Sequence, residues 1–451
     1  MQNNEFIETE KRLEAYTQKS IWIENYTLDR FLGFMKYLGS PHDSLRFVHI
    51  AGTSGKGSTT AYTQQILSSH GLKTGSFFSP HIFSVRERIC IDGEPVSEEE
   101  FTAVFDEVAA AHDNYFTDKT GVTLIYFEFV LAMAFVLFAR RHLDAVVLEV
   151  GMGGKLDPTN IIDAEVAVLT SVGLDHQEFL GNTVEEIAAD KVQILKPSRT
   201  MVTGVTSSSV LRVIEDHAVR MNATLLRTGR DFTASDITVN RAGTVFTYTK
   251  DRQVQVTLRQ HGRHQAENAA VALTAAAEFL GDRFNPDHAA LALQDTRLNG
   301  RIQIFSEDPL VITDVAHNAD KMAALVRTLD EIDPDVKIRL VTGFKKGRDK
   351  VRARDAVRQL STIKDRLQAV YLCDFAATQD LYVSSVPAAE LDLIFDEILP
   401  GVTRTSYTDV NQAVLQAVAQ LQDDEMLLIT GSFYLLGLLD TASLRSALEA
   451  M

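Results

Sequence analysis

The stretch His49-Ile50-Ala51-Gly52-Thr53-Ser54-Gly55-Lys56-Gly57-Ser58-Thr59-Thr60 decides the fold, because its pattern is typical of a phosphate-binding loop. It follows a short apolar run, residues 47–50, and precedes a helical segment, residues 61–69. Strand, glycine loop and helix are the context in which backbone N–H groups bind phosphate. The common spacing would place glycine at position 50 and a hydroxyl at position 57, where this chain has Ile50 and Gly57. We predict nucleotide binding, against the alternative of a structural glycine turn.

Each residue type in this loop has a distinct part in binding a nucleoside triphosphate. Gly52 and Gly55 permit tight turns that direct N–H groups inward, and Lys56 supplies a positive charge for the β- and γ-phosphates. Ser58 or Thr59 provides a hydroxyl that can reach Mg²⁺. We expect the nucleotide to contact the whole loop: Gly52, Thr53, Ser54, Gly55, Lys56, Gly57, Ser58 and Thr59.

Length, charge and cysteine content limit the classes of protein to consider. A chain of 451 residues suggests two or three domains. The formal net charge of −17 argues against a nucleic-acid partner. Two cysteines, Cys90 and Cys373, cannot form a disulfide framework, which favours a reducing compartment. The N-terminus does not resemble a signal peptide, and the longest apolar stretch, residues 127–139, is too short to span a bilayer. We expect a cytoplasmic protein without membrane contact.

Polar side chains stand at the ends of several predicted strands. Ser79 follows a short strand, Glu149 lies near the end of the apolar run 145–150, and His176 follows the run 166–170. Open α/β sheets bind their ligands at the carboxyl ends of strands. A carboxylate in a buried strand is costly without a cation, so we favour Glu149 as a metal ligand over a structural hydrogen-bonding role. Ser79 in a simple turn and His176 in a simple loop pair remain the alternatives.

Three further features are open to two interpretations each. The glycine-rich segment 151–160 permits close backbone approach to a ligand, or simply forms a wide turn. Glu128 lies within an apolar helix over residues 123–138, where it needs either a salt bridge or an active-site role. Lys191 lies on a helix over residues 184–195, where solvation is the default expectation.

Strands that alternate with helices predict two parallel α/β sheets, because parallel strands need crossover connections. We predict an N-terminal domain over residues 1–297, with a phosphate-loop-type, mostly parallel sheet flanked by helices. A smaller, Rossmann-like C-terminal α/β domain is expected over residues 298–451. Local predictions are a helical region over 5–38, an edge strand or hairpin over 85–92 with its arginines in solvent, and a last helix that begins at 431.

Several motifs together resemble the folylpolyglutamate synthase/dihydrofolate synthase family of the Mur ligase superfamily. Any one of them is weak, but their order and spacing extend over nearly the whole chain. They are residues 49–58, 78–81 (Phe-Ser-Pro-His), 87–89, 127–128, 148–157, 159–160, 174–176 (Leu-Asp-His), 187–191, 264–269, 300–301, 316–318 (Ala-His-Asn) and 431–434 (Gly-Ser-Phe-Tyr).

The resemblance implies ATP and two Mg²⁺ ions as cofactors, and it implies roles residue by residue. Lys56, His176 and Lys191 would be the catalytic residues, with Lys191 carbamylated. The remaining roles fall into three sets: ATP contacts beyond the loop at Asn268, Arg301, Asp314 and His317; metal ligands at Ser58, Ser79, Glu149 and His176; and acceptor contacts near Lys155, Asp157, Thr159 and Asn160.

The implied reaction is amide ligation. ATP phosphorylates the carboxylate of a folate or pteroate-type acid, and the amine of L-glutamate attacks the acyl phosphate. We expect a monomer with these small-molecule substrates. Alternatives are a Mur-type ligase for another carboxylic acid, a phosphate-loop ATPase or kinase without ligation, and a non-catalytic nucleotide-binding module. The sequence departs from the family pattern at Ser54, Lys155, Pro158, Leu298, Asn299 and Val315, where Asn, Arg, Ala, Trp, Pro and Gly are usual.

Overall fold

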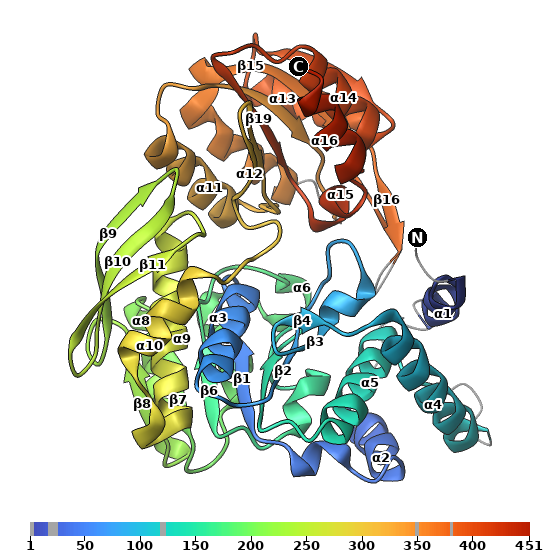
Figure 1. Ribbon diagram of the computed structural model, residues 1–451, viewed down its shortest axis with the longest axis vertical. Coiled ribbons are helices and arrows are strands. Elements are labelled where there is room, and N and C mark those ends of the chain that lie inside the picture. Colours follow the sequence, from blue (N-terminus) through green and yellow to red (C-terminus); the bar gives the residue numbers. More distant parts are fainter. Residues whose placement is uncertain (1–3, 17–25, 118–122, 348–350, 379–381) are drawn as a thin grey trace. The chain divides into compact units, whose positions relative to one another are not determined.

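The computed structural model describes residues 4–16, 26–117, 123–347, 351–378 and 382–451, and it divides into two compact units (Figure 1). Unit 1 comprises Met1–Ile237, Val245–Leu258 and His264–Thr296. Unit 2 comprises Thr238–Thr244, Arg259–Arg263 and Arg297–Met451. No helix among the described residues is both long and apolar enough to cross a membrane.

The centre of unit 1 is a sheet that, over the described residues, has eight strands in the order β4-β3-β2-β5-β1-β6-β7-β8. The strands from β2 to β8 in this order run parallel, and β3 and β4 add an antiparallel edge. Their bounds are β1 Phe47–Ala51, β2 Thr74–Phe77, β3 Ile89–Ile91, β4 Glu94–Pro95, β5 Ala145–Glu149, β6 Val166–Leu169, β7 Thr200–Thr203 and β8 Thr224–Arg227.

Strand β1 lies between β5 and β6 at the middle of this sheet. All of its residues are buried, as expected for a parallel strand covered by helices on both faces. The chain leaves β1 toward β2 on one side, whereas β6 pairs on the other side. This reversal of strand order opens a crevice at the carboxyl end of β1, where such sheets bind ligands. The glycine-rich loop of the sequence begins at that point.

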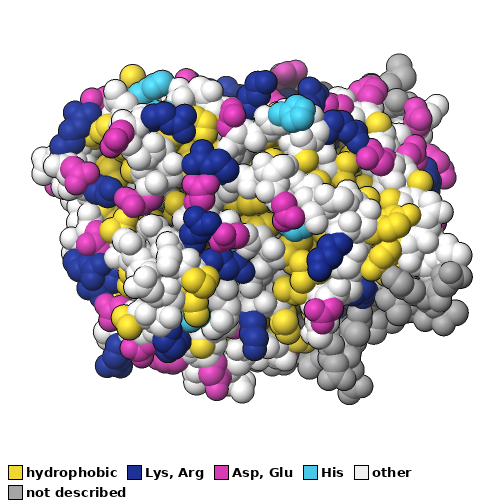
Figure 2. Space-filling model, turned by 90° about the horizontal axis from the view of Figure 1, so that it is seen from below, with side chains coloured by type: hydrophobic (Ala, Val, Ile, Leu, Met, Phe, Trp, Pro, Cys, Tyr) yellow, Lys and Arg dark blue, Asp and Glu magenta, His cyan; other side chains and the backbone are white. Residues whose placement is uncertain are grey.

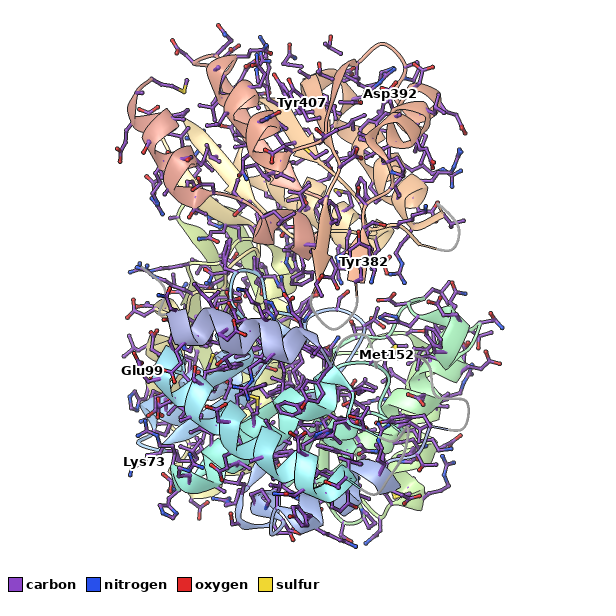
Figure 3. All side chains as sticks on the ribbon, turned by 90° about the vertical axis from the view of Figure 1, so that its right-hand side faces the viewer. Lys73, Glu99, Met152, Tyr382, Asp392 and Tyr407 are labelled. Atoms are coloured by element: carbon purple, nitrogen blue, oxygen red, sulfur yellow. The ribbon has the colours of Figure 1, made fainter. Side chains whose placement is uncertain are left out.

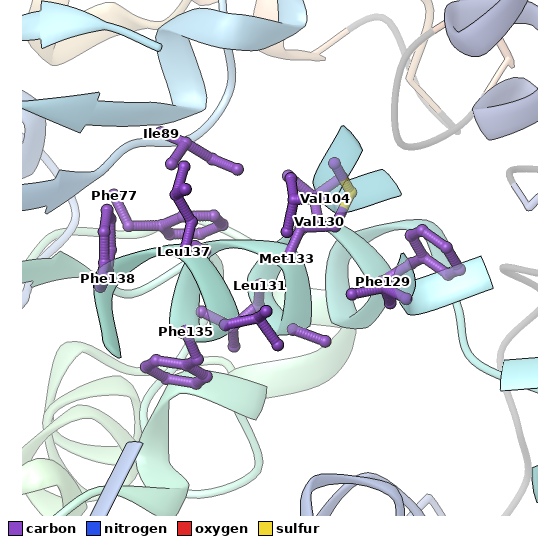
Figure 4. Close-up of a cluster of buried hydrophobic side chains, with 14 of the residues drawn as sticks. Phe77, Ile89, Val104, Phe129, Val130, Leu131, Met133, Phe135, Leu137 and Phe138 are labelled. Atoms are coloured by element: carbon purple, nitrogen blue, oxygen red, sulfur yellow. The ribbon is translucent and has the colours of Figure 1, made fainter. Parts of the chain in front are cut away.

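One face of the sheet packs against a largely apolar helix, α5 (Tyr126–Arg140). Its side chains enter a core that also receives residues of α1 (Asn4–Glu14), α2 (Asp29–Tyr37) and α4 (Glu98–Phe116). Figure 4 shows Phe135 leaving α5 on one side, and Val130 and Leu137 leaving it on the other. A helix that is hydrophobic on every side must be buried, which explains its place between the sheet and other helices.

The remaining helices of unit 1 flank the strands near the glycine-rich loop. Helix α3 (Lys56–Ser69) packs on β2, β5 and α10 (Pro286–Gln294), and α7 (Val184–Lys191) packs on α8 (Ser208–Arg220). In the chain, α6 (Gln177–Leu180) directly precedes α7, and α9 (Arg263–Leu280) precedes α10. A three-stranded antiparallel sheet follows α8: β9 Thr233–Asn240, β10 Gly243–Thr249 and β11 Gln253–Leu258.

Unit 2 has its own sheet, with the order β12-β13-β19-β14-β15-β18 over the described residues. Only β12 is antiparallel to its neighbour among these described strands. The bounds are β12 Gln303–Glu307, β13 Leu310–Thr313, β14 Lys337–Thr342, β15 Leu367–Cys373, β18 Thr403–Tyr407 and β19 Glu425–Thr430, with a small pair of β16 Ala376–Thr378 and β17 Tyr382–Ser384. The helices are α11 Ala319–Ile332, α12 Val351–Leu360, α13 Ala388–Ile398, α14 Val410–Ala419, α15 Phe433–Gly437 and α16 Thr441–Glu449.

Charged side chains of both signs are mixed on one face of the molecule. On the face seen in Figure 2, Lys and Arg lie among Asp and Glu rather than in a field of one sign. The net charge of −17 is therefore not gathered into one block on that face.

The structure corrects three local predictions. The region 5–38 contains two helices, α1 and α2, and part of the predicted helix, residues 17–25, lies outside the described residues. Residues Val85–Arg88 form a 3₁₀ turn capped by Ser84, and only the next residues enter the β3–β4 hairpin. Arg88 is fully buried rather than solvated, and its Nε donates to His81 Nδ1 at 2.9 Å. The last helix is α16, because a break after α15 ends the helix predicted from 431.

For Glu128, the structure shows the salt bridge rather than the active-site role that the sequence also allowed. Its carboxylate is fully buried, 2.5 Å from Nη2 of Arg30, and it accepts a hydrogen bond from the Tyr26 hydroxyl at 2.7 Å. These partners neutralise the buried charge.

Candidate active site

The loop between β1 and α3 is held in shape by the residues that follow β6. The N–H groups of Thr53 and Ser54 donate to the carbonyl and the hydroxyl oxygen of Ser171, each at 2.9 Å. The hydroxyls of Thr170 and Ser171 donate to the Ser54 carbonyl at 2.7 and 2.9 Å. These two amides therefore shape the loop, whereas the first N–H groups of α3 have no carbonyl partner within the helix. The helix N-terminus is the part of the loop that presents donors to an anion.

The unusual glycine spacing has a steric cause. Gly52 has φ +154°, and a Cβ there would lie 1.9 Å from Oγ1 of Thr170. Gly55 has φ +87°, and a Cβ there would lie 2.3 Å from Oδ1 of Asn268, on α9. Only glycine fits both positions. Asn268 therefore lies beside the loop, and the Lys56 ammonium donates to the Gly52 carbonyl at 3.2 Å.

Oxygen donors that suit a magnesium ion lie near the same sheet edge. Glu149 ends β5 and pairs in register with Ile50 of β1. Its carboxylate is 5% exposed and accepts the Ser79 N–H at 3.0 Å, which brings Ser79 beside it. Ser58 and Thr59 are buried in the first turns of α3, and Thr59 Oγ1 has no hydrogen-bond partner within the described residues.

His176 follows β6, with its ring 3.9 Å from the Asp175 carboxylate. Among the described residues, no group of three or more His, Cys, Asp and Glu is placed to hold a metal. A carboxylate with hydroxyls still fits Mg²⁺, because that ion is commonly bound by one or two carboxylates together with phosphate oxygens and water. The donors present thus fit a metal that arrives with a nucleotide.

Lys191, the last residue of α7, is only 4% exposed, so the expectation of a solvated side chain is wrong. Its pKa is lowered to about 8, chiefly by burial and then by the nearby charge of Lys56, whereas Asp175, Asp190 and Asp157 act in the opposite direction. A substantial fraction of the amine is therefore neutral and nucleophilic near pH 8. The glycine-rich segment explains the burial, since a Cβ on Gly154 would lie 2.6 Å from the Lys191 carbonyl.

The segment 151–160, which we call the acceptor loop, is braced from within. Asp157 accepts the N–H of Met152 at 2.8 Å and the N–H of Thr159 at 2.9 Å, and the Thr159 hydroxyl also donates to it. Met152 is labelled in Figure 3. Asp157 and Thr159 are 4% and 0% exposed, so their side chains hold the loop together. Lys155, by contrast, is exposed.

His49 of β1 completes this brace, and sequence reasoning missed it. Its Nε2 lies 2.8 Å from the Thr159 hydroxyl oxygen, and its Nδ1 is buried without a partner within the described residues. Because Thr159 donates to Asp157, His49 must donate through Nε2. Burial lowers the pKa of His49 to about 3, so the ring stays neutral. The only signal in the sequence was a polar residue in the middle of a buried strand.

The predicted nucleotide residues of unit 2 gather around an aromatic ring. The Arg301 guanidinium lies 4.7 Å from the centroid of the Phe433 ring, and the His317 ring centroid lies 5.8 Å from it. Asp314 is buried and accepts the N–H groups of Ile302 at 2.9 Å and Ala316 at 2.6 Å. Phe433 was not predicted, although the motif that contains it was noted. The structure therefore groups Arg301 and His317, while Asp314 shapes the turn between them.

Two family models match the sequence. The Mur ligase middle domain matches residues 50–276, and the Mur ligase, glutamate ligase domain matches residues 300–433. A dihydrofolate synthase/folylpolyglutamate synthase of Bacillus subtilis is 30% identical over 444 residues, which cover 93% of this chain and 97% of that protein. The chain belongs to the folylpolyglutamate synthase/dihydrofolate synthase family of Mur ligases.

Other relatives support this membership. A probable bifunctional folylpolyglutamate synthase/dihydropteroate synthase of Halobacterium salinarum is 33% identical over 402 residues, which are 88% of this chain. The chain spans about half, 47%, of that longer protein. The folylpolyglutamate synthase of Mycobacterium tuberculosis in complex with ADP has a TM-score of 0.88 and 26% identity, with 98% of each chain covered. A bifunctional folylpolyglutamate synthase/dihydrofolate synthase with Mn, AMPPNP and L-glutamate bound has a TM-score of 0.77 and 28% identity, with 94% and 95% covered.

Membership confirms the predicted fold of this Mur ligase, and the relatives' bound ligands agree with a nucleotide and a divalent metal. Lys56 and Asn268 both lie against glycines of the loop. The charge of Lys56 also acts on Lys191. It places Glu149 beside Ser79 at the neighbouring strand ends. The individual ligand contacts of these residues stay predictions.

Proposed function

We propose that this Mur ligase is an ATP-dependent amide ligase that adds L-glutamate to a folate, with dihydropteroate as a second acceptor to be tested. The observation that carries the proposal is the edge of the unit 1 sheet, where the phosphate loop, the Glu149 carboxylate and the partly neutral Lys191 occur together. The relatives are named folylpolyglutamate synthases, and one of them holds L-glutamate with a nucleotide analogue.

The first chemical step is phosphoryl transfer to the acceptor. An oxygen of the acceptor carboxylate attacks the γ-phosphorus of ATP, the bond from that phosphorus to the β,γ-bridging oxygen breaks, and ADP leaves. Lys56 and the first amides of α3 offset the charge that develops on the transferring group. We propose that Ser58, Ser79, Glu149 and His176 hold two Mg²⁺ ions, which supply further charge neutralisation when bound.

The second step forms the amide. The neutral amine of L-glutamate attacks the carbonyl carbon of the acyl phosphate, the carbon–oxygen bond to phosphate breaks, and the nitrogen loses a proton. This sequence needs no nucleophilic side chain on the enzyme. The protein's part is to orient the two substrates and to keep water from the acyl phosphate.

Lys191 is proposed to act as a carbamate. The ammonium first loses a proton. The neutral amine then attacks the carbon of carbon dioxide, a nitrogen–carbon bond forms as one carbon–oxygen π bond opens, and the nitrogen releases a second proton, so that a cation becomes an anion. The lowered pKa near 8 supports this step, because only the neutral amine reacts. An anion at this position would face the ammonium of Lys56 and offset its charge.

The remaining contacts divide between the substrates. We propose that Asn268 in unit 1, and Arg301, Asp314 and His317 in unit 2, bind the nucleotide. Because the side chains of Asp157 and Thr159 are used within the acceptor loop, the exposed Lys155 is the side chain of that loop that we propose for acceptor binding.

The deciding experiment measures phosphate release from ATP with purified protein. Release is expected to require both tetrahydrofolate and L-glutamate, and mass spectrometry should show a product with one more glutamyl unit. Release without an amino acid would favour an ATPase. Release with another carboxylic acid, but with neither tetrahydrofolate nor dihydropteroate, would keep the ligase and reject the folate acceptor. Light scattering of the same sample checks the expected monomer.

A further inference from the structure

A cavity of about 480 Å³ opens in unit 1 away from the phosphate loop. Its walls come from two segments, residues 161–163 and 196–199, which precede β6 and β7 in the chain. Because these strands run parallel to β1, their amino ends lie at the edge of the sheet opposite to the loop that follows β1. The cavity is therefore separate from the proposed catalytic edge.

The charges around the cavity do not balance. Asp163 is the one carboxylate among the described residues of its wall, and Arg199 already pairs with both of its oxygens, Nε–Oδ1 at 3.1 Å and Nη2–Oδ2 at 2.6 Å. Glu165 also acts on Arg199 through its charge, but both of its oxygens are paired with Arg46, at 2.7 and 2.8 Å. Lys196 is half-buried, and its ammonium donates only to neutral oxygens, the carbonyl and the Oδ1 of Asn160, each at 2.9 Å. Arg46, Lys196 and Arg199 thus face the carboxylates of Asp163 and Glu165, which leaves the partly buried charge of Lys196 without a hydrogen-bonded carboxylate among the described residues. Such a charge is costly until an anion compensates it.

Unused donors and an apolar wall indicate what kind of anion fits. The Lys196 ammonium has a third N–H, and Nη1 of Arg199 makes no hydrogen bond within the described part of the chain. Ile161 and Pro197, in the same wall, offer apolar surface. Asp163 would repel the second charge of a dianion such as phosphate. One negative charge and a small apolar body match this lining.

We propose that this cavity is a binding site for a small organic monocarboxylate, whose carboxylate accepts hydrogen bonds from Lys196 and Arg199 and whose apolar body lies on Ile161 and Pro197. Bound there, the carboxylate accepts the third N–H of Lys196 and attracts the ammonium that also donates to Asn160. Asn160 is the last residue of the acceptor loop, and its Nδ2 donates to the Lys155 carbonyl at 3.2 Å within the same loop. The ligand therefore acts on the acceptor loop through Lys196.

Binding is tested first on the full chain, with benzoate as the probe and isothermal titration calorimetry as the measurement. Benzoate is expected to bind, and benzamide, which has the same shape without the charge, is expected not to. Arg199→Gln should weaken benzoate binding at least about tenfold. The matched control is Arg252→Gln, which removes a similar exposed arginine–aspartate pair with Asp287 outside the cavity.

Several results would overturn the site. They are no binding of benzoate, equal binding of benzamide, unchanged binding to the Arg199→Gln protein, and inorganic phosphate that displaces benzoate at equal concentration. Lys196→Met is a second variant, but it also removes the two hydrogen bonds that Lys196 donates to Asn160. The decisive variant is therefore Arg199→Gln. A thermal unfolding curve of each variant confirms that it is folded before titration.

The effect on the acceptor loop rests on the proposed function and is measured separately. Benzoate should raise the KM for tetrahydrofolate and leave the KM for ATP unchanged, and Arg199→Gln should abolish this effect. An equal rise in both KM values would reject the link through Asn160. Calorimetry tests benzoate binding even if the protein does not ligate folates. Failure of the binding site can therefore be distinguished from failure of the proposed ligase function.

Discussion

Among single residues, Lys56 of the phosphate loop is proposed to act on the phosphates of ATP. Its side chain is partly exposed and donates a hydrogen bond to the Gly52 carbonyl at 3.2 Å, so little folding energy depends on it. Lys56→Ala should lower the rate of phosphate release by at least about a hundredfold, as loss of a charge-stabilising donor does. The melting temperature should stay near that of the wild type.

Lys73→Ala is the control for that variant. Lys73 is also exposed, but it precedes β2, at the amino end of a strand parallel to β1 through β5, and it is labelled in Figure 3 well away from Met152. Both rates are measured at saturating ATP. An active Lys56→Ala enzyme would contradict the central assignment of the loop.

His49 makes a prediction about pH. Its pKa is about 3 in the folded protein and 6.5 in the reference state, so the unfolded chain binds more protons between these values. The stability that the neutral ring provides is complete above pH 6.5 and decreases as the pH falls, by at most about 1.4 kcal/mol per pH unit. His49→Gln, which keeps an N–H donor for Thr159, should lose less stability than the wild type between pH 6.5 and pH 5.

Urea unfolding curves of both proteins at several pH values measure this difference. His49→Phe is the companion variant, because it leaves the Thr159 hydroxyl without its donor. It should lower the free energy of unfolding by about 1–3 kcal/mol at pH 7.5. Identical pH slopes for the wild type and His49→Gln would show that His49 does not carry the titration.

At the scale of elements, the end of α7 depends on the glycine-rich segment beside it. Gly154 lets that segment approach the backbone of Lys191, and this contact buries the amine that is proposed to become a carbamate. Lys191→Ala should abolish ligation, and small carboxylates such as formate should restore part of it, because they replace the missing anion. Absence of rescue, together with no carbamate signal from labelled bicarbonate in the wild-type NMR spectrum, would reject carbamylation.

The pH dependence of that step follows from the same pKa. Because the neutral form of Lys191 increases as the pH rises through about 8, activation should be faster at pH 8.5 than at pH 7 when both buffers contain the same concentration of dissolved carbon dioxide. Enzyme depleted of carbon dioxide is diluted into each buffer, and the rate at which its ligase activity then rises is measured. The Lys191→Ala protein, rescued with formate, serves as the control without this activation phase.

The same element shows how far sequence reasoning could reach. Periodicity predicted the helix that contains Lys191, and strand order placed Glu149 and Ser79 at one edge. Burial of Lys191 could not be predicted, because Gly154, which encloses it, lies far from it in the sequence. His49 and Thr159 are separated by 110 residues, and Arg88 likewise reads as a surface residue until its place beside His81 is known. Local patterns indicate elements, whereas these side chains are defined by contacts between elements.

For the whole molecule, the chain alternates between its two compact units more than once. The tips of the β9–β11 sheet belong with unit 2, where the His261 ring contacts the carbonyl oxygens of Ile302 and Arg241 at 3.2 and 3.1 Å. The predicted domain boundary between residues 297 and 298 is a single position, so it cannot describe a chain that enters unit 2 at residues 238–244 and 259–263 before returning to unit 1. The two α/β sheets themselves were predictable, because alternating strands and helices permit few other arrangements.

The role of metal is a prediction about the whole protein. Among the described residues, no cluster of three or more His, Cys, Asp and Glu could hold an ion, so Mg²⁺ is expected to bind with ATP rather than to support the fold. EDTA should therefore abolish phosphate release but leave the melting temperature of the nucleotide-free protein unchanged.

ATP with Mg²⁺ should raise that temperature, since a ligand that binds only the folded state stabilises it. ATP with EDTA should raise it less, and Lys56→Ala should reduce both effects. If EDTA alone lowers the melting temperature, the metal is structural and the donors around Glu149 form a permanent site.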